Sequence, residues 1–254
     1  MSDEVLVERR GAIQVITINR PAKKNALDAG VAAGVAAAVD ELDESDELRV
    51  GVLTGAGGTF SAGMDLKAWL RGETPAIEGR GLCGISMTPP NKPLIAAVEG
   101  WALAGGFELL LACDLVVAAR TARLGVPEVT RSLVARAGAA LHLPRRVPYA
   151  IALELLLTGQ PIDAGRAAAH GLINRLTDEG GALAGALELA ETIAANGPLA
   201  VAATKRIARS TADWTLDEAW GKQFDIAEPV FQSHDAREGA AAFAEKRPPV
   251  WKGR

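Results

Sequence analysis

The segment that most constrains the fold is the apolar stretch from Leu94 to Ala119. Polar residues and glycines interrupt it at Glu99, Gly100, Gly105, Gly106, Glu108 and Asp114. A membrane-spanning helix needs about 20 consecutive, predominantly apolar residues. The stretch is therefore predicted to form two buried strands, at 94–98 and 115–119, with a tight turn and a helix through 107–111 between them.

The same alternation of strands and helices continues toward the N-terminus. Two short β-branched runs, Val5–Val7 and Ile13–Ile18, predict a hairpin. Asp28 is a predicted N-cap for the helix that follows. Residues 50–54 predict another strand, which runs into a glycine-rich turn at 55–58. This alternation favours an α/β fold.

The last part of the chain is predicted to be helical, because strand signals stop after about Val134. Helical patterns are found at 150–157, 163–170, 183–195, 216–226 and 236–246. Asn196-Gly197-Pro198 predicts the end of one helix and the start of the next. We therefore divide the chain into a core of residues 1–195 and a helical region of residues 196–254.

Composition excludes several classes of protein. The chain has 27 Lys and Arg against 31 Asp and Glu, a net charge of −4, which gives no electrostatic reason to expect binding to nucleic acid or to an anionic membrane surface. Its 3 histidines are scattered and its 2 cysteines lie far apart, so no metal site is expected. No basic segment followed by an apolar one is visible at the N-terminus, and a cytoplasmic protein is expected.

The loop from Arg71 to Asn91 differs from its surroundings. Glycines and prolines recur through it, between two segments with firm structure. We expect an irregular loop that shapes a substrate pocket.

Two glycine-containing junctions suggest where a ligand binds. Thr59–Leu66 follows a strand and opens a helix, so its backbone N–H groups face whatever lies in front of it. Taken alone, this segment favours a structural turn, because many loops in α/β proteins have this pattern. In Trp101–Glu108, Gly105 and Gly106 permit close approach of a ligand to the backbone at a helix N-terminus.

Two carboxylates accompany these junctions. Glu108 lies on the helix face that leans toward Gly105, although it could instead cap its own helix. Ala104 cannot supply the other half of a capping box, which weakens that alternative. Glu128 follows Pro127 just after a predicted strand, and by itself it could be an exposed loop carboxylate.

Together these groups suit the addition of water to a conjugated thioester. Two backbone N–H donors can stabilise an enolate oxyanion. Two carboxylates in one site can split their pKa values and act as general base and general acid.

Several motifs along the chain, in order and spacing, resemble the crotonase (enoyl-CoA hydratase/isomerase) superfamily. They are Asn19-Arg20-Pro21 with Asn25-Ala26-Leu27, Phe60–Leu66, Ala104–Glu108, Pro127-Glu128 and the tail from Glu238 to Arg247. The resemblance covers nearly the whole chain. It implies a spiral of ββα units with a C-terminal helical region that builds trimers, often paired into hexamers.

The resemblance also implies roles for individual residues. The N–H groups of Met64 and Gly105 would form the oxyanion hole, Glu108 would activate water, and Glu128 would protonate the α-carbon. The residues implied at the CoA moiety are Lys23, Ala26, Ala62, Asp65, Leu66, Lys67, Phe243 and Lys246, the last two often from a neighbouring subunit. No metal or redox cofactor is implied, since CoA arrives as part of the substrate.

One departure from the family pattern concerns the acyl group. Arg136 stands where a glycine is usual in hydratases. Its side chain could narrow the pocket, pair with an acid or bind an acidic substrate, or it could point to solvent.

The leading hypothesis is an enoyl-CoA hydratase. An enoyl-CoA isomerase and a non-catalytic acyl-CoA-binding protein are the alternatives.

Overall fold

The structure is a computed structural model that describes residues 3–254. Its main sheet has six strands in the order β1–β2–β3–β6–β8–β11. They are β1 (Val5–Arg10), β2 (Ile13–Ile18), β3 (Val50–Gly55), β6 (Leu94–Val98), β8 (Leu115–Ala119) and β11 (Arg175–Thr177). The first two form the predicted antiparallel hairpin, and the other neighbours are parallel.

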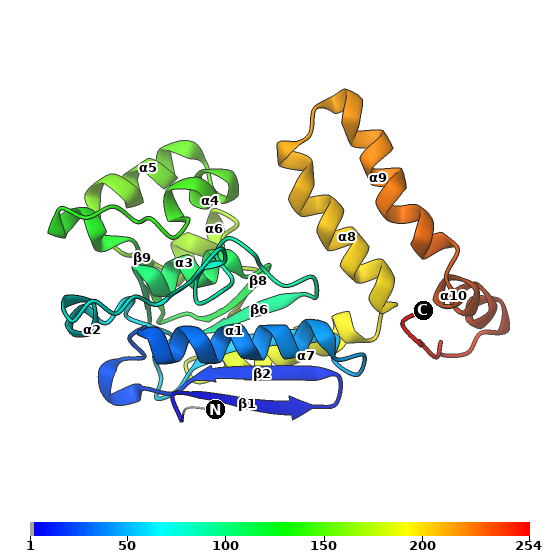
Figure 1. The fold of residues 1–254 in the computed structure, drawn as a ribbon, viewed down its shortest axis with the longest axis horizontal. Coiled ribbons are helices and arrows are strands. Elements are labelled where there is room, and N and C mark those ends of the chain that lie inside the picture. The colour runs from blue at the N-terminus through cyan, green and yellow to red at the C-terminus, as the bar shows by residue number, and fades with distance from the viewer. Residues whose placement is uncertain (1–2) are drawn as a thin grey trace.

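Helices cover both faces of this sheet (Figure 1). Helix α1 (Ala29–Glu44) begins after Asp28, whose side chain accepts a hydrogen bond from the Val31 N–H as the N-cap prediction requires. Helix α7 (Ala182–Ala194) packs on the opposite face through small alanines. Successive residues of a strand point to opposite faces, so Ile95 contacts the α7 layer while Ala96 joins the larger cluster that includes α1.

A second sheet contains β7 (Trp101–Leu103), β9 (Arg123–Gly125) and β10 (Ile162–Asp163), in the order β10–β9–β7. The chain passes from β6 to β7 through Gly100, which has a φ of +53°. A Cβ there would lie 2.4 Å from the Gly58 carbonyl oxygen, so the sharp turn between the sheets requires glycine.

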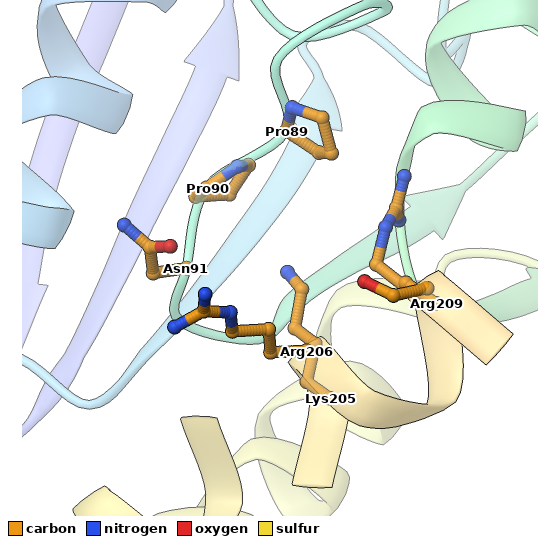
Figure 2. A pocket seen from close by; sticks show the side chains of 7 residues that line it. Pro89, Pro90, Asn91, Lys205, Arg206 and Arg209 are labelled. Carbon is orange, nitrogen blue, oxygen red and sulfur yellow. The ribbon is translucent and has the colours of Figure 1, made fainter. Parts of the chain in front are cut away.

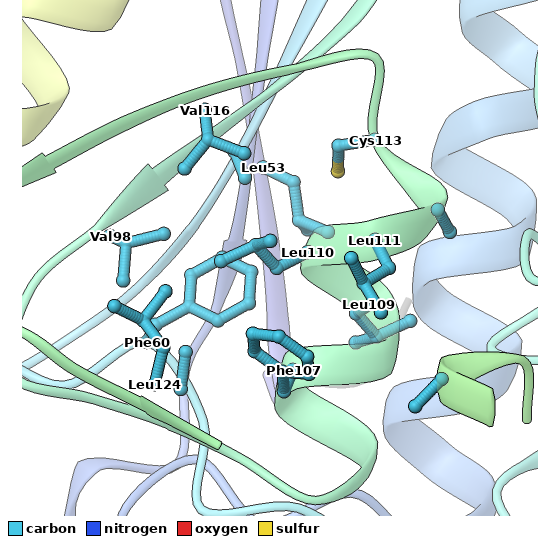
Figure 3. Packing of buried hydrophobic residues seen from close by; sticks show 14 of the residues in the cluster. Leu53, Phe60, Val98, Phe107, Leu109, Leu110, Leu111, Cys113, Val116 and Leu124 are labelled. Atoms are coloured by element: carbon cyan, nitrogen blue, oxygen red, sulfur yellow. The ribbon is translucent and has the colours of Figure 1, made fainter. Parts of the chain in front are cut away.

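Helix α3 (Gly105–Ala112) completes the strand–strand–helix unit that starts with β6 and β7. All of its residues are buried. Phe107 and Leu110 lie beside Phe60 in the main apolar cluster, which anchors the helix (Figure 3). This packing fixes the position of the N-terminus of α3, where the candidate site is built.

Two sequence-based expectations need correction in the middle of the chain. Strands do occur after Val134, since both β10 and β11 lie there. They have two and three residues, too few to show an alternating pattern. Helix α4 (Ala139–Arg146) was not predicted, and Pro144 within it obscures the helical pattern. Helices α5 (Tyr149–Thr158) and α6 (Ala164–Ala169) are confirmed.

The predicted irregular loop follows a short helix, α2 (Leu66–Leu70). It contains only one antiparallel pair of two-residue strands, β4 (Ala76–Ile77) and β5 (Gly81–Leu82). The remainder of 71–91 has turns and bends, so the prediction of an irregular segment is confirmed.

The last three helices, α8 (Pro198–Ser210), α9 (Leu216–Phe231) and α10 (His234–Glu245), extend away from the two sheets (Figure 1). We refer to residues 196–254 as the C-terminal arm. Neither α8 nor α9 contains a buried residue. Nowhere in residues 3–254 is a helix both long and apolar enough to cross a bilayer.

Polar contacts join the arm to the rest of the chain. Lys205 of α8 donates to a carboxylate oxygen of Asp114 at 2.6 Å and to the Lys92 carbonyl at 2.8 Å. Arg209 donates to the other Asp114 oxygen at 3.2 Å. Lys205, Arg209 and residues 89–91 border a small cavity of about 160 Å³ (Figure 2). Asp114 therefore holds α8 against the end of α3.

Candidate active site

A cavity of about 960 Å³ lies beside the N-terminus of α3. Its wall is formed by residues within 62–69, 74–87, 103–108, 127–131 and 133–142. The loop from Arg71 to Asn91 contributes part of this wall, and the N-terminus of α3 contributes another. The predicted pocket-shaping role of the loop agrees with this position.

Two backbone N–H groups lie side by side at the cavity. The Leu27 N–H donates to the Gly63 carbonyl and the Asp65 N–H donates to the Leu27 carbonyl, both at 2.8 Å, which fixes the chain on either side of Met64. Gly105 is the first residue of α3. A Cβ built on Gly105 would lie 3.7 Å from the Met64 nitrogen. Within residues 3–254 neither N–H has a protein acceptor, so both are available to a ligand oxygen.

The turn before α3 is strained, and hydrogen bonds to neighbouring segments hold it in place. Ala104 has a φ of +51°, a conformation that costs a non-glycine residue about 1–3 kcal/mol. Its N–H donates to the Gly125 carbonyl and the Leu103 N–H donates to the Ser61 carbonyl, both at 2.9 Å. These two bonds anchor the turn from which α3 starts.

Gly63 makes the close approach of the two donors possible. Its φ is +91°, and a Cβ there would lie 2.7 Å from the Ala104 Cβ and 3.1 Å from the Gly105 nitrogen. The hydroxyl of buried Ser61 accepts from the Gly63 N–H at 3.1 Å and donates to the Asn25 carbonyl at 2.8 Å. A larger residue at 63 would separate the donors.

Glu108 faces the cavity and is only 5% exposed. One of its carboxylate oxygens accepts from the Ala137 N–H at 2.7 Å and the Ala139 N–H at 3.1 Å. It does not cap its own helix, as α3 has no side-chain cap. Burial raises the pKa of Glu108 to about 7, with a further contribution from the charge of Glu128, although the Ala137, Gly138 and Ala139 N–H groups oppose this increase.

Glu128 lies in the short 3₁₀ helix η2 (Pro127–Arg131) and lines the same cavity. It is half-buried, so it is not an exposed loop carboxylate. One carboxylate oxygen is buried and has no hydrogen-bond partner in the described part of the chain. Burial raises the pKa of Glu128, against the opposing effect of the Arg131 charge. The fold thus brings both predicted acids to one cavity.

Comparison with known proteins identifies the family to which a chain with this sequence and fold belongs. A family model described as enoyl-CoA hydratase/isomerase matches residues 8–254. The chain belongs to this family. The predicted resemblance is confirmed.

Several similar proteins align with nearly the whole chain. The enoyl-CoA hydratase EchA19 from Mycobacterium tuberculosis is 44% identical over 258 residues, which span 99% of this chain and 97% of the relative. A carnitinyl-CoA dehydratase from Salmonella typhi is 40% identical, with 100% of both chains covered. The crystal structure of the enoyl-CoA hydratase EchA1 from Mycobacterium marinum matches with a TM-score of 0.98 and 58% identity over 100% of both chains. The predicted α/β crotonase-like fold is therefore confirmed.

The residues that the family resemblance assigned to CoA are not all at this cavity. Ala62 and Leu66 line it, whereas Lys23, Ala26, Asp65, Lys67, Phe243 and Lys246 do not. Phe243 is 88% exposed. It belongs to α10, which lies on the opposite side of the molecule from α2 (Figure 1). Within a single chain, the residues predicted to act on the thioester therefore meet at one cavity. The predicted CoA-binding residues of the C-terminal helices lie far from it.

Sequence reasoning missed the role of Arg20 in the family motif Asn19-Arg20-Pro21. Its guanidinium is buried and lies 3.0 Å from Glu4, 2.7 Å from Asp28 and 3.1 Å from Asp65. Asp65 also caps α2, accepting from the Lys67 and Ala68 N–H groups. Burial opposes ionisation of Asp65, but the Ala68 N–H and the Arg20 charge outweigh it and lower its pKa. Arg20 therefore ties the start of α1 to the segment that follows Met64.

Arg136 lines the cavity although its side chain is largely exposed. Its guanidinium makes no hydrogen bond or ion pair with residues 3–254, so the alternative in which it pairs with an acid of this chain is not observed. Arg131, Trp69, Met87 and His142 also line the cavity, and sequence reasoning did not single them out for it. The proximity of Arg131 to Glu128 in sequence was the one available signal.

Proposed function

We propose that this chain is an enoyl-CoA hydratase, which adds water across the double bond of a 2-trans-enoyl-CoA and gives a 3-hydroxyacyl-CoA. The observation that carries the proposal is the meeting of four groups at one cavity. Glu108 and Glu128 both line it, and the N–H groups of Met64 and Gly105 lie side by side at its edge. The reaction belongs to the degradation of fatty acids or related acyl-CoA compounds.

The backbone donors bind the thioester oxygen. As water adds to C3, the π electrons of the double bond move toward the carbonyl and negative charge develops on that oxygen. The N–H groups of Met64 and Gly105 stabilise this charge, and the dipole of α3 acts in the same direction at Gly105. Because the strained turn at Ala104 fixes the donors beforehand, little reorganisation is needed during the reaction.

The acids move the two protons. Glu108 takes a proton from water as the oxygen bonds to C3, and Glu128 gives a proton to C2 of the enolate. A pKa of about 7 allows Glu108 to accept and later release a proton near neutral pH. Burial raises the pKa of Glu128 and favours the protonated form that a donor needs.

CoA binding uses residues outside the thioester end of the cavity. We assign Lys23, Ala26, Ala62, Asp65, Leu66 and Lys67 to this role from their positions in the family motif. Asp65 contributes by capping α2 and holding Arg20, since its carboxylate is already engaged. No cofactor is proposed, because both proton transfers use side chains.

The remaining residues assigned to CoA, Phe243 and Lys246, are supplied by a neighbouring subunit of a homotrimer or hexamer. Their distance from α2 within one chain, together with the exposure of Phe243, supports this assignment. We place the enzyme in the cytoplasm, with no nucleic-acid partner and no insertion into a membrane.

Spectroscopic assay of purified protein tests this function. Addition of short, long and polycyclic 2-trans-enoyl-CoA substrates should cause loss of the conjugated-thioester absorbance, and mass analysis should find a 3-hydroxyacyl-CoA. A shifted double bond without added water would instead identify an isomerase. Binding of all these thioesters with no chemistry would identify a non-catalytic acyl-CoA-binding protein.

A further inference from the structure

Two arginines on the cavity wall, Arg131 and Arg136, form no ion pair with a carboxylate in residues 3–254. The charge of Arg131 nevertheless acts on nearby Glu128 and opposes the increase in its pKa. Arg136 makes no side-chain hydrogen bond or ion pair with any residue in 3–254. Arg131 has only a 3.4 Å contact with the Thr130 hydroxyl. Some arginines elsewhere are paired, such as Arg166 with Glu154 and Arg247 with Glu238. Arg120 and Arg175 likewise form no ion pair with residues 3–254, but they do not line the cavity. The guanidinium of Arg136 is therefore free to bind a ligand, and that of Arg131 has no direct contact with a carboxylate that would prevent it from assisting.

The cavity contains no surplus acid to balance them. Among residues 3–254, the carboxylates that line it are Glu108 and Glu128, which are assigned to the reaction. Glu108 directs one oxygen to the backbone N–H groups of Ala137 and Ala139 and not to the guanidinium of Arg136. The wall around the arginines is apolar, with Leu133, Val134 and Leu141. An apolar wall with an unpaired positive charge suits an apolar chain that ends in an anion.

The position of Arg136 relates it to the acyl side of the substrate. Ala137, the next residue, donates to Glu108 at 2.7 Å. In the proposed reaction Glu108 acts at C3, and the acyl chain continues from that carbon. The thioester oxygen is held at Met64 and Gly105, on a different part of the wall. Arg136 therefore lies next in sequence to a residue that contacts Glu108. Because Glu108 acts at C3, Arg136 is on the side of the site from which the acyl chain continues.

We propose that this enzyme accepts enoyl-CoA substrates whose acyl chain ends in a carboxylate, and that Arg136, assisted by Arg131, binds that carboxylate. The inference rests on the proposed hydratase function and specifies its substrate class. A guanidinium can hold a carboxylate through two parallel N–H···O bonds, which gives both affinity and direction. The same positive charge disfavours an acyl chain that ends in a cation.

Three enoyl-CoA series, matched in length and differing only at the end of the acyl chain, test the proposal. The ends are a methyl, a carboxylate and a trimethylammonium group. We expect kcat/KM to be highest for a carboxylate of suitable length, roughly 10- to 100-fold above the methyl analogue. The trimethylammonium substrate should be the poorest of the three.

Variants identify the responsible side chain. Arg136→Gln should bring the carboxylate-to-methyl ratio close to one, and Arg136→Lys should retain part of the preference. Arg120→Gln is the matched control, because Arg120 is an exposed arginine that does not line the cavity. Melting temperatures of all three variants verify that the fold is intact.

The Kd values of saturated thioesters with the same three ends are also measured, because binding requires no turnover. Their carboxylate-to-methyl ratio reports the preference in binding alone. Preference for the carboxylate in Kd without hydration would refute the proposed function and support this inference. Hydration with no preference for the carboxylate would overturn the inference alone. If Arg136→Gln weakens all three substrates equally, the guanidinium binds the phosphates of CoA and the inference is wrong.

Discussion

The sheet-containing part of the chain and the C-terminal arm are stabilised in different ways. The strands β3, β6 and β8 are almost entirely buried, and helices α1 and α7 bury apolar residues against them. In contrast, α8 and α9 bury no residue, while Leu216, Trp220, Phe224 and Phe231 are 62–80% exposed. Burial of apolar surface stabilises the first region, and the second leaves such surface available for contacts outside the chain.

The proposed sites of chemistry and of subunit assembly lie on either side of the same division. The N–H groups of Met64 and Gly105, which we propose as oxyanion donors, and the two acids lie in the sheet-containing part. The arm contributes no residue to the cavity within one chain. The cavity and its acids therefore belong to the part of the chain that has a buried core, whereas α8 and α9 have none.

The largest effect should come from the acids. Glu108→Gln and Glu128→Gln should each lower kcat by roughly 10²–10⁴-fold, because each removes one proton transfer. Affinity for a saturated acyl-CoA should be largely retained, as measured by calorimetry. Glu179→Gln is the control, since Glu179 is exposed and does not line the cavity. Full activity in either variant would mean that the residue has no catalytic role.

Ion pairs in the two regions should differ in strength. Arg20→Met leaves Asp28 and Asp65 buried without their counter-charge, and should lower the free energy of unfolding by about 3–5 kcal/mol. Arg209→Met, at the joint of the arm, should cost about 0–1 kcal/mol, since Asp114 keeps its contact with Lys205. Urea unfolding of both variants measures the difference. Equal losses would show that the two regions are not stabilised differently.

How much the sequence predicts also differs between parts of the molecule. The hairpin β1–β2, the β6–α3–β8 order and the Asp28 cap follow from local patterns and were predicted correctly. The strands β10 and β11 were not, because two or three residues carry no periodicity and depend on pairing with β9 and β8. Local sequence predicts an element well when the element itself contains its stabilising pattern.

The candidate site shows the same limit. The two junctions, the two acids and the family resemblance together made Glu108 and Glu128 candidates, and the fold places both at one cavity. The buried network of Arg20 joins residues as far apart in sequence as Glu4 and Asp65, and no local pattern encodes it. The contact of Glu108 with Ala137 is likewise a product of the tertiary fold.

Glu108 should also make stability depend on pH. In the unfolded chain it titrates near its ordinary pKa of 4.5, and in the fold its pKa is about 7. Between these values the folded state binds more protons at this site, so the free energy of unfolding decreases as pH rises. Above this range Glu108 is ionised in the folded state, and its raised pKa lowers the free energy of unfolding by about 3 kcal/mol, since one pKa unit corresponds to about 1.4 kcal/mol.

Glu108→Gln removes this titration while keeping the shape of the side chain. The variant should therefore be more stable than the natural protein at pH 8, and the difference should shrink toward pH 4.5. Urea unfolding of both proteins across this range measures it, with Glu179→Gln as the control. A difference that does not change with pH would contradict the raised pKa.

The smallest effect on the stability of a single chain should come from the exposed face of α9. Trp220 and Phe224 are 63% and 62% exposed, and their ring centroids are 6.4 Å apart. Their contact is worth only about 0.2–0.5 kcal/mol, so replacing both with Ser should barely change the free energy of unfolding at high dilution.

If this face of α9 joins subunits of the proposed trimer or hexamer, the same change should lower the mass measured by light scattering at micromolar concentration. Leu6→Ser, an exposed residue of β1, is the control and should leave the mass unchanged. An unchanged mass in the α9 variant would place the subunit contacts elsewhere, whereas a loss of several kcal/mol in the isolated chain would show that the arm stabilises its own core.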